Sequence, residues 1–388
     1  MSAESLPSFD EHIVPAGEAL KEPQLGYLKY AVSLAKRLIT ESRPVLSADE
    51  QRCLNEASEK LFIITRQDAG AEFRKTVGSD GTKTLTGIFF TRSLFEPLPM
   101  STNGLDANTE GIIRTISTVF LLTQITFHEL LHALQFANAR NKSTEGISIP
   151  KLFFNALQLK RSHLRMKVQD GYRRIFEKVS LPFKKENSFR FFEFANEMAI
   201  DGMTERYVGA AAENIVVDIV ARMGFDTEVS REIARELAPG LTKEYTERSV
   251  YSFEKHVAKE LSKSISSFIR NLPADSNHRI VREPAYKLIR AQASDDEAAY
   301  IVEFQLYEGS ITGDTTWLSM IKDVYGSEAY AIFARLPLRE QLLGIPKEVI
   351  EVYYDVTRKA YAADTNPDDR NEALVELALL LNLAPDKK

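Results

Sequence analysis

The chain has 388 residues, of which 44% are hydrophobic, so it can bury a large core and is long enough for two or three domains. Its formal net charge of −6 argues against general nucleic-acid binding, and it has no glycine-rich phosphate-binding loop. The single cysteine, Cys53, excludes an internal disulfide.

Residues 1–24 are polar, acidic and proline-containing, which predicts a disordered N-terminal tail. This tail lacks the basic start and apolar core of a secretory signal peptide. No apolar run in the chain is long enough to span a membrane. We therefore expect a protein of the cytoplasm, or one that is exported without a cleavable signal peptide.

Residues 25–141 predict a domain that combines a small sheet with one long helix. Residues 61–65 form a short apolar, β-branched run, and residues 83–91 alternate between apolar and polar side chains, so both predict strands. Residues 72–77 are expected to be the other arm of a hairpin that closes at Asp80-Gly81.

The most informative motif follows these strands, because residues 128–132 read His-Glu-Leu-Leu-His inside a stretch, 112–136, that contains no Gly or Pro. That stretch predicts one long, mostly buried helix. His128 and His132 would lie on one face of it and could bind one metal ion, while Glu129 could accept a proton from a metal-bound water. The pattern indicates a metal-dependent hydrolase; the alternative is a core helix whose polar residues pair with neighbours.

With the small residue Ala133 after it, this pentapeptide resembles the motif of the zincin metallopeptidases. The resemblance implies an α+β, mainly α fold, in which a small sheet precedes the motif helix and a helical C-terminal lobe follows. It also implies one Zn²⁺ ion, Glu129 as general base, a peptide or protein substrate, and a cleft beside the last strand before the helix. A second hypothesis keeps this fold without catalysis, as a silent zincin-like binding or regulatory protein that holds a protein partner.

A catalytic zinc site needs a third protein ligand, and no histidine occurs between His132 and His163. That leaves a carboxylate from a separate helix. Glu197, Asp201 and Glu205 are spaced i, i+4, i+8 and would form an acidic stripe on one helical face. A metal would neutralise their mutual repulsion, whereas the alternative is an ordinary solvated acidic face.

Two registers of this stripe resemble ligand elements of the gluzincin branch of the zincins. Asn196-Glu197 with Asp201 is similar to the element Asn-Glu-x-x-x-Asp, which implies that Glu197 binds zinc and that Asp201 orients His128. Residues 201–205 are similar to Glu-Gly-x-Thr-Glu with Asp in place of the ligand Glu, which implies Asp201 as ligand and Glu205 as orienter. We prefer Glu197, because its longer side chain matches the ligand of the family.

Gluzincins place their third ligand much closer to the second histidine, so residues 142–190 are interpreted as an insertion. The insertion is basic, and its apolar residues recur at helical spacing. An acidic partner or a nucleic acid is one explanation of the basic charge, but a packed helix with a solvated basic face is favoured.

Residues 191–388 predict the third-ligand helix and a helical C-terminal lobe. Helices are expected at residues 211–223, 228–237, 241–270, 283–291, 296–307, 316–325, 328–336, 347–362 and 370–383. A donor to the developing oxyanion is also needed. The candidates, between which the spacing does not choose, are Tyr207, Tyr251, His256, Tyr300, Tyr307 and Tyr325.

Overall fold

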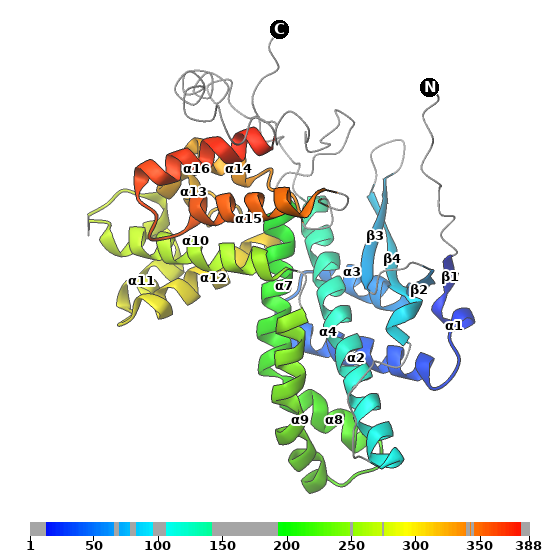
Figure 1. The fold of residues 1–388 in the computed structure, drawn as a ribbon. Helices are drawn as coiled ribbons and strands as arrows, with labels where there is room; N and C mark the ends of the chain where they lie inside the picture. The colour runs from blue at the N-terminus through cyan, green and yellow to red at the C-terminus, as the bar shows by residue number, and fades with distance from the viewer. Residues whose placement is uncertain are drawn as a thin grey trace, which may run out of the picture. The chain divides into compact units, whose positions relative to one another are not determined.

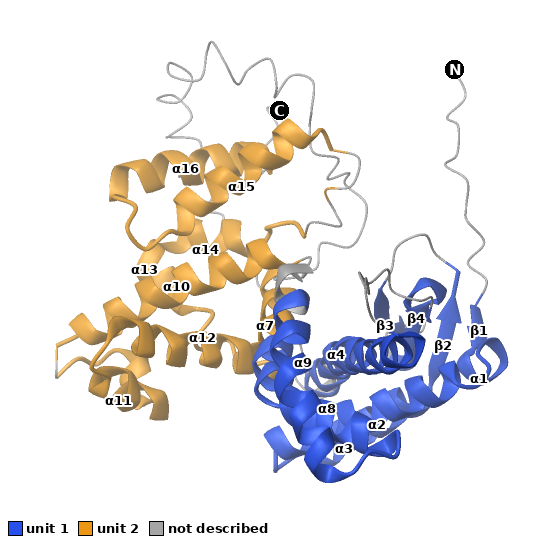
Figure 2. Ribbon diagram, turned by 60° about the horizontal axis from the view of Figure 1, so that its bottom comes forward, with its two compact units in different colours: residues 1–143, 203–249 blue, residues 144–202, 250–388 orange. Residues whose placement is uncertain are grey.

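The computed structural model describes residues 13–65, 70–77, 83–95, 106–141, 193–248, 251–273, 275–338, 342 and 345–381. This part of the chain is mainly helical with one four-stranded mixed sheet, which confirms the α+β, mainly α class (Figure 1). The predicted insertion at 142–190 lies outside the described residues. The chain divides into two compact units, 1–143 with 203–249, and 144–202 with 250–388 (Figure 2).

The sheet belongs to the first unit and has the strand order β1-β2-β4-β3. Its strands are β1 Ile13–Pro15, β2 Leu61–Ile64, β3 Ala71–Val77 and β4 Lys83–Thr91. β2 runs parallel to β4, while β1 is antiparallel to β2 and β3 is antiparallel to β4. The three strands expected before the motif helix are therefore confirmed.

β4, the last strand before the motif helix, is an inner strand of the described sheet. The substrate cleft expected beside it stays a prediction. β4 pairs with β2 on one side and β3 on the other, so its backbone hydrogen bonds are used within the sheet. The outer strand on this side is β3. An extended peptide that adds to the sheet here would pair with β3.

Part of the expected tail is structured, because residues 13–19 form β1 and the one-turn helix α1, Ala16–Ala19. Val14 pairs with Ile63 of β2, and the side chains of Ala16 and Leu20 are buried. Burial of these few apolar residues stabilises the segment. The polar composition of residues 1–24 as a whole did not indicate it.

Gly87 in β4 is required by a close approach of the backbone. Its φ angle is +151°, and a Cβ at this position would lie 2.4 Å from the carbonyl oxygen of Lys60. β3 has an irregular register opposite, between Arg74 and Lys75. The glycine allows two neighbouring chain segments to approach where the sheet is locally distorted.

The helix that carries the motif, α4, runs from Ala107 to Asn141 and is the centre of the first unit. It packs against β3 and against four helices, α2 Gln24–Ser42, α3 Ala48–Glu59, α8 Ala212–Arg222 and α9 Thr227–Arg248. Figure 1 shows it alongside the sheet. Its side chains Phe120, Leu130 and Leu134 are at most 1% exposed, and burial of each contributes about 1.5–3 kcal/mol.

The helix with the acidic stripe, α7, runs from Glu193 to Ala210, with residues through Gly202 in the second unit and residues from Met203 in the first. The other elements of the second unit are α10 Ser252–Asn271, η2 Arg279–Arg282, α11 Pro284–Ala291, α12 Asp295–Thr312, α13 Met320–Tyr325, α14 Ser327–Phe333, α15 Lys347–Tyr361 and α16 Pro367–Leu380. A short 3-10 helix, η1 Arg92–Phe95, follows β4 in the first unit.

Two boundaries in the helical region differ from expectation. The region from 191 to 388 is not one lobe, because α8 and α9 pack against α4 and join the first unit. The helix expected at 241–270 is two helices, since α9 continues through Pro239 to Arg248 and α10 starts at Ser252. Packing of α9 against α8 offsets the cost of a proline inside a helix, about 3 kcal/mol.

Among the described helices, none is both long enough and apolar enough to cross a membrane.

Candidate metal centre

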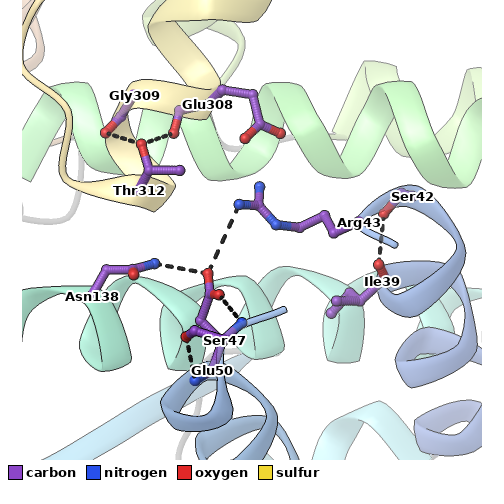
Figure 3. Close-up of polar contacts among 9 residues, drawn as sticks. All are labelled: Ile39, Ser42, Arg43, Ser47, Glu50, Asn138, Glu308, Gly309 and Thr312. Carbon is purple, nitrogen blue, oxygen red and sulfur yellow. Dashed lines mark hydrogen bonds and ion pairs between the residues drawn. The ribbon is translucent and has the colours of Figure 1, made fainter. Parts of the chain in front are cut away.

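Local interactions fix both ends of the described part of α4. At its start, Asp106 Oδ1 accepts hydrogen bonds from the backbone N–H groups of Asn108 and Thr109, at 2.9 and 3.1 Å. Near its end, Asn138 Nδ2 donates to Glu50 Oε1 of α3 at 3.0 Å (Figure 3). These contacts hold the helix from which the two histidines project.

Glu50 is itself held firmly, which makes it a rigid partner for α4. It forms a capping box with Ser47 at the start of α3, and Arg43 lies 3.9 Å from its carboxylate (Figure 3). Burial by itself raises the pKa of Glu50. The hydrogen bonds from Ser47 and Asn138 and the charge of Arg43 together lower the pKa by more than burial raises it, so the pKa lies below the usual range. The carboxylate is therefore ionised at neutral pH.

The motif lies in the C-terminal half of α4, with both histidines on one face. The rings of His128 and His132 have their centroids 5.1 Å apart at an interplanar angle of 68°. His128 is 9% exposed, His132 is half-buried, and Glu129 is 5% exposed. The helical spacing thus places two imidazoles and a buried carboxylate within one turn.

Glu197 of α7 completes a group of candidate metal ligands with these histidines. One ligand atom from each of His128, His132 and Glu197 lies within 4.8 Å of the others. Ligand atoms of a tetrahedral zinc ion are about 3.4 Å apart, which follows from bond lengths of about 2.0–2.1 Å. A set of two nitrogens and one oxygen fits a zinc ion with one position open.

The other two acids of the stripe are not in this group. Among the described residues, the cluster contains Glu197 but neither Asp201 nor Glu205. Asp201 is 2% exposed and lies 3.2 Å from Nζ of Lys255 on α10, while Glu205 is half-buried. This arrangement supports the register with Glu197 as ligand. The role of Asp201 as the orienter of His128 stays a prediction.

Two neighbours of the site were missed in the sequence. Nδ1 of His132 lies within hydrogen-bond distance of Oε1 of Gln135, at 3.0 Å, and Nζ of Lys255 lies 3.2 Å from the carboxylate of Asp201. Gln135 could have been predicted from the sequence, since a residue three positions after a histidine lies on the same helical face. Lys255 could not, because its partner is distant in the chain and belongs to another helix.

The segment of α7 that bears Glu197 also packs closely against α12. Ser310 Oγ donates to Asn196 Oδ1 at 2.9 Å, and the ring of Tyr307 covers Gly202. A Cβ at Gly202 would lie 2.4 Å from two ring carbons of Tyr307. Gly202 therefore has a packing reason of its own, apart from its place in the second register.

Contacts of the candidate oxyanion donors give two of them structural roles. The hydroxyl of Tyr307 donates to Glu303 at 2.5 Å, and the hydroxyl of Tyr325 donates to the carbonyl of Tyr361 at 3.0 Å. Burial raises the pKa of Tyr325 to about 12. The ring of Tyr207 packs on Phe127 of α4, with centroids 6.1 Å apart. None of these contacts selects one candidate as the donor.

The chain was compared with protein-family models, with curated proteins and with solved structures, and none of the three gave a match. The candidate centre consists of two imidazoles, one carboxylate that converges on them and one buried acid next to the first histidine in the chain.

Proposed function

We propose that the chain is a zinc-dependent metallopeptidase of the gluzincin type. The observation that carries the proposal is the convergence of His128, His132 and Glu197, whose ligand atoms lie within 4.8 Å of one another. These residues come from two helices far apart in the chain, α4 and α7, so helical spacing alone does not bring them together. The buried Glu129 lies directly beside the first histidine in the chain.

Each residue has a role that its chemistry supports. The two imidazoles are neutral ligands and Glu197 is an anionic one, so a divalent ion held by them keeps a net positive charge. When bound, zinc would polarise the peptide carbonyl and make water a better proton donor. Glu129 accepts the proton of the attacking water and returns it to the leaving amine.

The position of β3 supports a polypeptide as the substrate. β3 is one of the two outer strands of the described sheet, and its Phe73 contacts Phe136 of α4, with ring centroids 6.0 Å apart. Phe136 follows His132 by about one helical turn, so β3 lies close to the motif. A peptide that adds to β3 by backbone hydrogen bonds would be aligned near the proposed centre.

Three variants test the proposal through two measurements, zinc content of the purified protein and hydrolysis of a diverse peptide library. We expect stoichiometric zinc in the wild type. Glu129→Gln should keep the zinc but lower hydrolysis at least about 100-fold, because it removes a general base. Glu197→Gln should lose zinc and activity together. Glu205→Gln is the matched control, from the same helix but outside the ligand group, and should behave as wild type.

Absence of zinc from the wild type, or unchanged hydrolysis by Glu129→Gln, would contradict the proposal. Zinc that is bound without hydrolysis of any peptide would replace it with the second hypothesis, a silent zincin-like protein that holds a protein partner. Loss of zinc from Glu205→Gln rather than from Glu197→Gln would favour the other ligand register.

A further inference from the structure

The contact between His132 and Gln135 bears on which ring nitrogen of the histidine carries the proton. Nδ1 of His132 and Oε1 of Gln135 are 3.0 Å apart, and both residues belong to α4. An amide oxygen only accepts, so a hydrogen bond with the amide in this orientation needs the proton on Nδ1. A neutral imidazole has one N–H, and the lone pair is then on Nε2.

We propose that Gln135 is a positioning residue, which holds His132 in the Nδ1–H tautomer and orients its ring so that Nε2 is the metal-binding atom. Neither residue is fully exposed, so bulk water competes only partly for the bond. The acceptor also makes the ring a more basic ligand. The proposal rests on the proposed metal site, but its first measurement needs no metal.

The first test determines the tautomer of His132 by NMR of the imidazole nitrogens in metal-free protein at alkaline pH, where the ring is neutral. The wild type should show the proton on Nδ1. Gln135→Met keeps the length of the side chain without an acceptor, and Gln135→Ala removes the side chain while keeping high helix propensity. Both should show a mixture of tautomers, whereas Gln135→Glu should keep the wild-type tautomer.

The second test measures zinc affinity by competition with a chromophoric chelator. Loss of the acceptor in Gln135→Met or Gln135→Ala should weaken binding about 10–100-fold, as for other residues that orient metal-binding histidines. Gln135→Glu should bind at least as tightly as wild type. The matched control is Asn138→Leu, which removes a different amide hydrogen bond from α4, the one to Glu50. It should lower the melting temperature but leave tautomer and zinc affinity unchanged.

An unchanged tautomer in both Gln135→Met and Gln135→Ala would overturn the inference, and so would unchanged zinc affinity in the two variants. An equal loss of affinity in Asn138→Leu would also overturn it, since the effect would then report only on the stability of α4. Failure of the wild type to bind zinc would overturn the proposed function instead, and the tautomer measurement would still decide the role of Gln135.

Discussion

Asp201 is a carboxylate inside the protein, 2% exposed, and Lys255 is its ionic partner at 3.2 Å. An ionised side chain is stable at such a site only with a compensating charge. Two acids on the same helix thus have different partners. Asp201 pairs with a lysine, whereas Glu197 converges on the two histidines.

Lys255→Met should therefore be strongly destabilising. It removes the cation 3.2 Å from the buried carboxylate of Asp201, and the expected loss in the free energy of unfolding is about 3–5 kcal/mol, measured by chemical denaturation. Lys259→Met, at an exposed position of the same helix, should change it by less than about 0.5 kcal/mol. Adding Asp201→Asn to Lys255→Met should recover most of the loss. A cost equal to that of Lys259→Met would mean that the pair contributes no stability.

The sequence predicts the parts of the site that depend on spacing within one helix. His128, Glu129 and His132 are readable in this way because the α-helical repeat alone puts the histidines on one face. The choice between Glu197 and Asp201 is not, because it depends on which residues of other helices lie nearby. Lys255 and Asp201 meet only through packing of α10 against α7, and no interval along the chain encodes that contact.

At the scale of elements, α7 depends on a small residue at its contact with α12. The ring of Tyr307 lies where a side chain on Gly202 would begin, and Tyr307 is only 1% exposed, so it has little room to move. The same helix has a second glycine, Gly209, whose nearest neighbour for a Cβ is Thr242 Cγ2 at 3.5 Å, an ordinary contact distance.

The two glycines give opposite expectations for the same substitution. Gly202→Ala should destabilise the protein by about 1–3 kcal/mol, because it overpacks the contact with Tyr307. Gly209→Ala should be neutral or stabilise it by up to about 1 kcal/mol, because alanine is the better helix former. Thermal unfolding of the two variants beside wild type measures the difference. A Gly202→Ala protein that melts at or above the wild-type temperature would contradict the packing argument.

Most elements could be predicted where the local pattern was strong. The alternating residues 83–91 form β4 as expected, and the Gly- and Pro-free stretch around the motif forms α4. Two of the misses share one cause, which is packing that outweighs the local signal. Pro239 predicted a break but lies inside α9, and residues 13–19, predicted to belong to a polar tail, form β1 and α1 against the sheet.

At the scale of the whole molecule, the proposed ligands come from two helices that are far apart in the chain, α4 and α7. A metal that binds only when α4 and α7 are both folded stabilises the native state by mass action.

The order of the strands is also a property of the whole molecule. It places β3 rather than β4 at the outer position, and it could not be predicted because long-range pairing, not the pattern of each strand, decides it.

Zinc should therefore raise the melting temperature of protein that has been treated with a chelator. At free zinc about 100-fold above the dissociation constant, the expected stabilisation is about 2.7 kcal/mol. The shift should disappear in Glu197→Gln and persist in Glu205→Gln, and differential scanning calorimetry measures both. An equal shift in Glu197→Gln would mean that zinc binds the folded protein without this carboxylate.

The irregular register of β3 between Arg74 and Lys75 has a consequence for association between copies of the protein. A long, flat and uncharged outer strand readily pairs with the same strand of another molecule and so promotes aggregation. β3 has this irregular register and carries Glu72, Arg74 and Lys75, and each of these features disfavours such pairing. The outer strand can thus stay accessible to a short partner chain while indefinite stacking of copies is discouraged.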